Sequence, residues 1–302
     1  MTGSTERYFS LNNYFRQKFG HKVAKISLDA GLTCPNRDGT LSRCGCIYCD
    51  EKGSGSGANE AGSSLAEQLE TGLSRMTGRA PKFMAYFQSF TNTYAPLAEL
   101  KRIWDLALSP DEIMGLAIGT RPDCLWDDVL DALEQYARDH EIWLELGLQS
   151  AVDQTLTLIN RGHTAGDFAQ AVGRARGRGI KILAHVILGL PGEGERETET
   201  TARFIANLGI DGVKIHSLYI PKGTQLAAMY ERGDFRCLDQ EEYVGLAVKF
   251  LELLPEEVVI HRLTGDPDPG ALIAPAWCRT WTVGRGNCYK YPRTRFKHAC
   301  DV

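Results

Sequence analysis

Apolar residues along this chain gather in short runs that alternate with segments of helical periodicity. Runs typical of buried strands occupy 23–29, 83–87, 113–118, 142–146, 180–188, 212–218 and 258–263. Between them, helix-like periodicity marks 64–73, 126–136, 167–176 and 241–251. Strand–helix alternation at roughly 30-residue spacing predicts right-handed βαβ units and a parallel sheet. The pattern therefore indicates an α/β fold, either a doubly wound sheet or a partial barrel.

Four of the nine cysteines lie in one short segment after the first predicted strand. Cys46 and Cys49 form a CxxC pair, a spacing at which one tight turn directs two thiolates toward one metal or cluster. Cys34 lies upstream, across turn-forming residues such as Pro35 and Gly39 that let the loop fold back on itself. The segment therefore predicts a thiolate-rich loop delivered by a strand.

Three kinds of site are possible interpretations of this loop. A structural zinc site usually takes two well-separated CxxC-like pairs, whereas Cys44 and Cys46 are separated by one residue. A redox CxxC begins a helix, whereas 50–57 is a run rich in glycine and serine. A [4Fe–4S] cluster held by three thiolates leaves one iron open for a small molecule. The spacing favours the cluster and leaves zinc and redox chemistry open.

The strand, the motif at 32–39 and the CxxC at 46–49 together resemble the radical S-adenosylmethionine (SAM) superfamily. Within it, they are similar to the YhcC/YtqA-type bacterial proteins, which are related to the Elongator catalytic subunit and to the oxygen-independent coproporphyrinogen dehydrogenase. The resemblance runs from about residue 7 to 277. It implies a partial (β/α)6 TIM-like barrel in place of a doubly wound sheet.

The resemblance also implies the cofactors. Cys34, Cys46 and Cys49 would hold a [4Fe–4S] cluster whose open iron binds the amino and carboxylate groups of SAM, and Cys44 would be a spectator. An external one-electron donor of the flavodoxin or ferredoxin type would reduce the cluster. The expected function is reductive cleavage of SAM and hydrogen abstraction from a substrate, for which the family suggests a tRNA wobble-uridine side chain.

Composition narrows the class of protein. The chain has 302 residues, 43% hydrophobic and 24% charged, so it can bury a substantial core. No apolar run reaches the roughly 18–20 residues of a membrane span, and the N-terminus lacks the apolar region of a signal peptide. Nine cysteines, mostly clustered, argue against a disulfide framework and predict a reducing cytoplasm.

Charge is distributed unevenly along the chain. The net charge is −4, yet residues 1–30 carry five Lys or Arg against two acidic residues, and 271–302 carry six against one. Solvation of the two ends explains this as well as a nucleic-acid surface does. We expect an N-terminal extension at 1–22, the core barrel at 23–265 and an atypical C-terminal extension at 266–302. The last lacks helical periodicity, so it is disordered, an accessory cysteine site or a reading-frame accident.

Polar residues follow most predicted strands, where ligand-binding loops of a barrel lie. By resemblance, the segment at Gln88 would meet the amino group of SAM, and Thr120 and Asp123 would bind its ribose. Capping of the helix that begins near Trp126 is an equal alternative for Asp123. Gln149 would meet the ribose region as well.

Later strand ends supply the remaining candidates. By resemblance, Arg161 would bind the SAM carboxylate, for which a planar guanidinium is suited. Side-chain parity directs Glu145 into the barrel, where a buried carboxylate needs a functional role or a partner such as Arg161 or Arg121. The fifth strand directs His185 inward and ends at Gly189, which would approach the adenine.

The sixth strand places Lys214 and His216 on one face. A lone histidine is more often a packed core residue, but beside an inward lysine it is a substrate-site candidate. Glu145, Lys214 and His216 are therefore the candidate catalytic residues. Two other functions stay open: an iron–sulfur electron-transfer or interaction protein without SAM chemistry, and a zinc-binding nucleic-acid module.

Overall fold

The computed structural model describes residues 7–51, 53 and 62–279. The two ends of the chain beyond this range, and with them most of the basic residues of 271–302, lie outside the described residues. Within the described part, no helix is long and apolar enough to cross a membrane.

Seven parallel strands form one sheet in the order β1-β2-β3-β4-β5-β6-β8, so each strand except the last pairs with its successor in the sheet order. The sheet curls into a half-barrel, which confirms the predicted α/β partial barrel: six β/α units and a seventh strand. Every predicted strand is present. The strands are β1 (Val23–Leu28), β2 (Lys82–Phe87), β3 (Ile113–Thr120), β4 (Glu141–Gln149), β5 (Lys181–Leu188), β6 (Gly212–Ser217) and β8 (Val259–Arg262).

The connecting helices pack their apolar faces on the outer face of this sheet. Together with outward-facing strand residues such as Ile26, Leu144 and Ile215, they form the main hydrophobic core. Side-chain caps define several helix starts, for example Ser64 with Glu67 and Thr164 with Asp167. The helices are α2 (Leu65–Met76), α3 (Leu97–Leu108), α4 (Asp127–Tyr136), α5 (Asp153–Leu158), α6 (Ala165–Ala175), α7 (Glu195–Leu208), α8 (Gln225–Glu231) and α9 (Gln240–Glu252).

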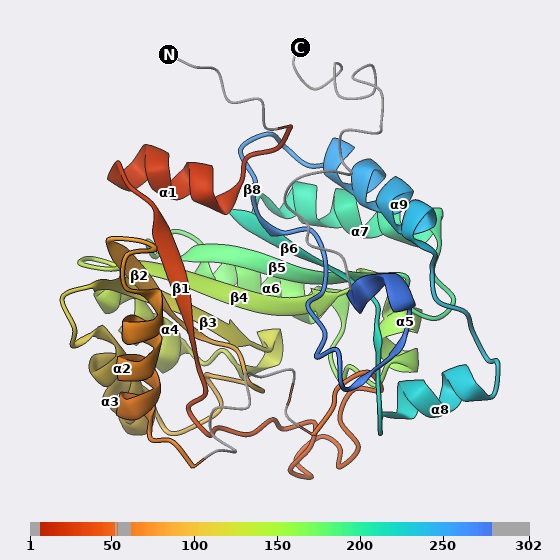
Figure 1. Cartoon of the computed structure of the whole chain (residues 1–302), viewed down its shortest axis with the longest axis horizontal. Helices are drawn as coiled ribbons and strands as arrows, with labels where there is room; N and C mark the ends of the chain where they lie inside the picture. The colour runs from red at the N-terminus through yellow and green to blue at the C-terminus, as the bar shows by residue number, and fades with distance from the viewer. Residues whose placement is uncertain (1–6, 52, 54–61, 280–302) are drawn as a thin grey trace.

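Helix α1 (Leu11–Phe19) closes the amino-terminal end of the half-barrel. Its Phe15 is fully buried and packs with inward-facing residues of the strands, among them Met84 and Trp143. In Figure 1, α1 lies at the top of the view and the loop that follows β1 lies at the bottom. The inner face is therefore apolar at one end and open to polar loops at the other.

The first residues of the predicted C-terminal extension contact the barrel. Strand β9 (Leu272–Ala274) pairs in antiparallel fashion with β7 (Ile220–Pro221), and a short 3₁₀ helix spans Ala276–Arg279. Buried Cys278 lies 3.5 Å from the hydroxyl of Ser217, measured between Sγ and Oγ. The boundaries at 22/23 and 265/266 stay a prediction, and residues 280–302 lie outside the described part.

Candidate functional site

A cavity of about 750 Å³ opens at the carboxyl ends of the strands, a size in the range of small-molecule sites. Its wall combines the loop after β1 with inward-facing residues of the sheet. Eleven of the thirteen predicted site residues line it, and Asp123 and Gly189 do not. The eleven are Cys34, Cys46, Cys49, Gln88, Thr120, Glu145, Gln149, Arg161, His185, Lys214 and His216.

The cysteine loop is fastened to the barrel by main-chain hydrogen bonds. Ile47 donates its N–H to the carbonyl of Ile159 and accepts at its own carbonyl from the N–H of Leu226, while Gly45 donates to the carbonyl of Asn36 within the loop. Gly45 adopts a positive φ of 70°, a conformation that favours glycine. Three of the four thiols in this loop therefore face one cavity, whereas the fourth, Cys44, is exposed and lies off the cavity wall.

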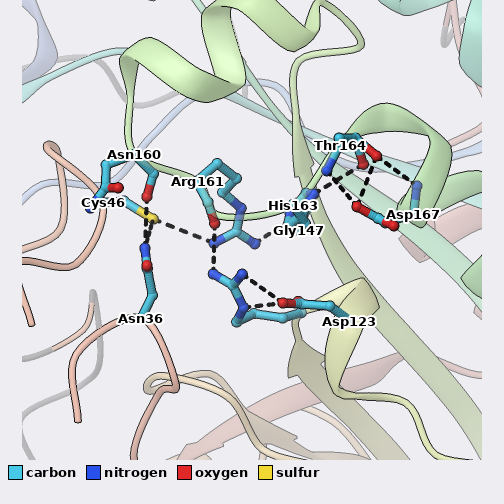
Figure 2. Close-up of polar contacts among 10 residues, drawn as sticks. Asn36, Cys46, Asp123, Gly147, Asn160, Arg161, His163, Thr164 and Asp167 are labelled. Carbon is cyan, nitrogen blue, oxygen red and sulfur yellow. Dashed lines mark hydrogen bonds and ion pairs between the residues drawn. The ribbon is translucent and has the colours of Figure 1, made fainter. Parts of the chain in front are cut away.

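Arg161 lies directly against one of these thiols (Figure 2). Its Nη1 is 3.5 Å from Cys46 Sγ, and its Nη2 donates to the carbonyl of Gly147 at 2.8 Å. Burial alone would raise the pKa of the Cys46 thiol, but the charge and hydrogen bond of Arg161 outweigh it and hold the pKa below its ordinary value. Arg161 Nε is buried and has no hydrogen-bond partner within the described residues.

Cys49 has a cationic neighbour of its own. Arg37 Nη1 lies 3.5 Å from Cys49 Sγ and also donates to the carbonyl of Asp50. Burial, followed by repulsion from the neighbouring Cys46 thiolate, raises the pKa of Cys49 to about 12, and Arg37 opposes this only in part. A bound metal centre would supply the positive charge that lets several adjacent thiols ionise together.

The side chains available as metal ligands can be compared with what each kind of metal centre requires. Within the described part of the chain, no three side chains among His, Cys, Asp and Glu converge closely enough to hold one metal ion. A tetrahedral zinc site needs four such ligands within about 2.3 Å of the ion. Cys34, Cys46 and Cys49 all line one cavity, as the three thiolate ligands of one iron–sulfur cluster would.

Asp123 and Gly189 are the two predicted cofactor contacts that do not line the cavity. Asp123 accepts hydrogen bonds from Nε and Nη2 of Arg121 at 2.9 and 2.8 Å, off the cavity wall. The capping alternative for Asp123 is wrong, because α4 begins at Asp127 and its cap position is Trp126. Gly189 has a φ of 90°, and a Cβ added there would lie 2.8 Å from the side chain of Leu238. The neighbour that Gly189 approaches closely is therefore Leu238.

Gln149 occupies an unusual backbone position at the end of β4. Its φ is 73°, and the pairing with β5 shifts register between Gly147 and Gln149. Positive φ is uncommon for a residue with a side chain and accumulates at functional sites. The bulge leaves Gln149 on the cavity wall, whereas Thr120 Oγ1 lies 2.6 Å from Thr93 Oγ1.

Deeper in the barrel, Glu145 is the centre of a polar cluster. Its Oε2 accepts from His185 Nε2 at 2.8 Å and from Lys214 Nζ at 3.2 Å, and its Oε1 pairs with Lys25. The alternative partners Arg161 and Arg121 are therefore wrong for Glu145. Burial opposes its charge, but the ammonium groups of Lys214 and Lys25 outweigh burial and hold the pKa of Glu145 well below its usual range.

The pKa values of the bases around Glu145 are lowered as well, which favours their neutral forms. Burial, with repulsion from Lys25, lowers the pKa of Lys214 to about 7 although Glu145 opposes the shift. Burial and the charge of Lys214 lower the pKa of His185 to about 4. Burial also holds the pKa of His216 and His261 well below the ordinary value. The imidazoles of this cluster are therefore neutral near pH 7.

The comparisons agree with this arrangement. The family model of the Radical SAM superfamily matches residues 33–205, and that of the Radical_SAM C-terminal domain matches 210–285. The chain belongs to the radical SAM superfamily. It is 41% identical to YtqA of Bacillus subtilis over 285 residues, covering 93% of this chain and 88% of that protein.

Two further proteins show the extent of the similarity. YhcC of Escherichia coli strain K12 is 42% identical over 270 residues, covering 88% of this chain and 86% of that protein. The solved structure of Elp3 from the archaeon Methanocaldococcus infernus superposes with a TM-score of 0.62 at 19% identity, covering 83% of this chain and 58% of that one. This last likeness shows that the two chains share a fold.

The superfamily motif does not identify several residues of the polar cluster. Tyr86, whose hydroxyl accepts from Lys214 Nζ at 2.6 Å, lines the cavity together with Lys25 and His261. Side-chain parity along β1, β2 and β8 places these three on the inner face, by the argument that selects Lys214 and His216. The signal was present in the sequence, but only the pairing of neighbouring strands shows that the residues meet.

Proposed function

We propose that this chain is a radical SAM enzyme that binds a [4Fe–4S] cluster through Cys34, Cys46 and Cys49. The observation that carries the proposal is that these three thiols line one cavity, beside buried Arg161, in a chain of this superfamily. The cluster and SAM together would supply the chemistry: one-electron cleavage of a C–S bond to give a 5′-deoxyadenosyl radical that takes hydrogen from a substrate.

The residues of the chain then bind, orient and exclude water. Arg161 is positioned to offer its unpartnered Nε to the carboxylate of SAM while it stays against Cys46. Gln88, Thr120 and Gln149 would present polar groups to the amino and ribose parts from the ends of three neighbouring strands. An external one-electron donor of the flavodoxin or ferredoxin type would reduce the centre.

The first prediction tests the metal centre. Anaerobically reconstituted protein should contain about four irons and four sulfides per chain. Replacing Cys34, Cys46 or Cys49 by Ala should abolish the iron content and the visible charge-transfer absorption. Cys44→Ala is the matched control in the same loop and should leave both intact, since Cys44 lies off the cavity wall.

Two results would decide for the alternatives. Stoichiometric zinc with little iron in that preparation would support the zinc-binding module. A complete cluster that never cleaves SAM when reduced with dithionite would support an iron–sulfur electron-transfer or interaction protein. Formation of 5′-deoxyadenosine, measured by chromatography, supports the enzyme.

For the substrate, we propose a tRNA wobble-uridine side chain. The support is the resemblance to YhcC/YtqA-type proteins, together with 29% identity to human Elongator complex protein 3 over 51% of this chain. The barrel body is acidic, so the basic residues at the two ends of the chain would supply the phosphate contacts. Most of those in the C-terminal part lie beyond residue 279, outside the described residues.

The second prediction tests this substrate class. Binding of bulk tRNA should fall by roughly 0.7–0.9 log unit per log unit of salt for each phosphate neutralised. Removal of residues 280–302 should flatten that slope and leave cleavage of SAM without tRNA unchanged. Negligible tRNA binding at about 0.15 M salt, with no change on truncation, would instead indicate a small-molecule or protein substrate.

A further inference from the structure

The inner end of the cavity carries more positive than negative charge. Lys25 and Lys214 both face the single carboxylate of Glu145, and both ammonium groups lie over the ring of Tyr86, at 4.8 and 4.3 Å from its centroid. Lys214 is 5% exposed and Glu145 is 1% exposed. Among the described residues Glu145 is the counter-ion of both, so when both lysines are protonated one positive charge is left uncompensated in a buried place, which is costly.

Neutral groups with hydrogen-bonding capacity surround these charges. His185 and His216 stack with their ring centroids 5.4 Å apart, and His261 packs against the other side of the cluster, with Nδ1 3.3 Å from Lys25 Nζ. The Nε2 atoms of His216 and His261 are buried and without a partner within the described residues. Both residues belong to the cavity wall.

We propose that this inner end of the cavity binds a carboxylate group of the substrate between Lys214, Lys25 and His216. The inference rests on the proposed function for the identity of the reaction, but the binding itself does not depend on the cluster. A carboxylate brings one negative charge, which matches the one uncompensated ammonium group. A phosphate group carries about 1.5–2 negative charges near pH 7, so part of its negative charge would remain uncompensated in this site.

The pKa of Lys214 supports this assignment. The groups that face its ammonium are Glu145, Tyr86, Lys25 and the neutral imidazoles. Repulsion from the charge of Arg262 also lowers its pKa. With only one carboxylate among them, burial lowers the pKa of Lys214 to about 7. A bound carboxylate would favour the ammonium form and raise this pKa. Binding should therefore be strong below pH 7 and weaken as the pH rises above it.

This site differs from the one proposed for the carboxylate of SAM. Arg161 packs on Gly147, where a Cβ would come within 2.3 Å of its Nη2. Glu145 lies one inward-facing position before Gly147 on β4, about 6–7 Å along the strand, and Lys214 Nζ reaches it from β6. Two carboxylates bound in successive layers of the barrel would place the substrate beneath SAM.

The test uses acetate as the probe. Saturation-transfer NMR of the acetate methyl group, at pH 6.5 on the anaerobically reconstituted protein, should give a dissociation constant. Lys214→Met removes the uncompensated charge and leaves Glu145 paired with Lys25, so it should weaken binding at least about tenfold, as expected for a hydrogen bond between charged groups. The control, Lys22→Met, makes the same change at an exposed lysine next to β1 and should leave binding unchanged.

A second variant keeps the proposal testable if Lys214→Met does not fold. Glu145→Gln removes the internal carboxylate, so a bound acetate becomes the counter-ion of both lysines and should bind at least as tightly as in the wild type. Weaker binding by folded Glu145→Gln, or equal binding by Lys214→Met, would overturn the proposal. Tighter binding of inorganic phosphate than of acetate would overturn the choice of a carboxylate.

Competition with SAM separates this inference from the proposed function. Acetate that still binds at saturating SAM supports a second carboxylate site. Displacement of acetate by SAM would mean that Lys25 and Lys214 bind SAM itself, and it would overturn the inference. Acetate binding by protein that fails to assemble a cluster would keep this inference and remove the proposed function. Normal SAM cleavage by protein that does not bind acetate would keep the proposed function and overturn this inference.

Discussion

At the scale of single residues, two arginines control the electrostatics of the cysteine loop. Arg161 and Arg37 each place a guanidinium nitrogen 3.5 Å from a thiol, that of Cys46 and that of Cys49 respectively. Hydrogen bonds to ligating sulfur are among the factors that set the potential of an iron–sulfur cluster. Asn36 adds a third contact, from Nδ2 to Cys46 Sγ at 3.6 Å. Arg161 alone among them also presents a buried, unpartnered N–H.

The third prediction follows from that free donor. Arg161→Ala should keep the cluster but weaken SAM binding by about 1.5–3 kcal/mol, the scale for losing a hydrogen bond to a charged group. Anaerobic titration of SAM against the reconstituted variant measures the change. Arg178→Ala is the control, because Arg178 pairs with Asp131 and Glu134 away from the cavity. Equal SAM affinity would mean that Arg161 serves the cysteine loop only.

At the scale of elements, strand β4 organises the cavity. Its inward positions carry Glu145, Gly147 and Gln149 in succession. Glu145 gathers the cations, Gly147 admits the guanidinium of Arg161, and the bulge before Gln149 reorients its side chain. The neighbouring strand β3 presents small residues, Ala117 and Gly119, at the inward positions of its carboxyl-terminal half, which leaves room for a ligand.

The fourth prediction concerns the glycine of β4. Gly147→Ala would place a Cβ 2.3 Å from Arg161 Nη2, and contact with Cys46 limits where the guanidinium can move. We expect SAM affinity to fall by roughly tenfold, the effect of one hydrogen bond to a charged group. The same anaerobic titration measures it.

A helical glycine supplies the matched control. Gly173 lies within α6, and an added Cβ there meets nothing within 4 Å. Gly173→Ala should leave SAM affinity unchanged and raise the free energy of unfolding by about 0.5–1 kcal/mol. Unchanged affinity in both variants would show that the guanidinium adjusts to the extra methyl group without losing its ligand.

At the scale of the whole molecule, the half-barrel is closed at one end and polar at the other. Helix α1 packs Phe15 against the base of the barrel, and the cysteine loop covers the opposite end. Between them lie imidazoles that burial keeps neutral, among them His163 and His185, with pKa values lowered to about 3 and about 4. In mild acid the unfolded chain therefore binds protons at these histidines that the folded chain does not bind.

The fifth prediction is a loss of stability in mild acid. Between the ordinary histidine pKa near 6.5 and the lowered value of about 4, the unfolded chain protonates His185 and the folded chain does not. The free energy of unfolding should then fall as the pH falls, by up to about 1.4 kcal/mol per pH unit for each such histidine. Thermal unfolding followed by circular dichroism between pH 7.5 and pH 4.5 measures it.

One variant identifies the source of this acid sensitivity. His163 lies with Nε2 3.0 Å from the carbonyl of Gly147, and His163→Gln retains a donor there but removes the titrating ring. Its unfolding midpoint should decline less steeply between pH 6.5 and pH 4.5 than that of the wild type. A midpoint that stays constant over this range in the wild type would contradict the prediction.

The sequence by itself determined the repeating architecture and the chemistry of the loop. Buried parallel strands are continuous apolar runs, so all seven strands were predictable from local composition. Cysteine spacing and turn-forming residues are local as well, which is why the thiolate loop was predicted without a structure. Side-chain parity also directed Glu145, Lys214 and His216 inward, because the alternation of side chains is a property of each strand alone.

Only the tertiary structure decided which of these residues meet. Lys25, Tyr86 and Glu145 belong to three strands that are far apart in sequence, and their contact depends on the lateral register of the sheet. Register is set by packing across the whole barrel, which no single strand encodes. For the same reason, the partners of Glu145 proved to be two lysines and a histidine from other strands. Local sequence specifies the face on which a residue lies, and packing specifies its neighbours.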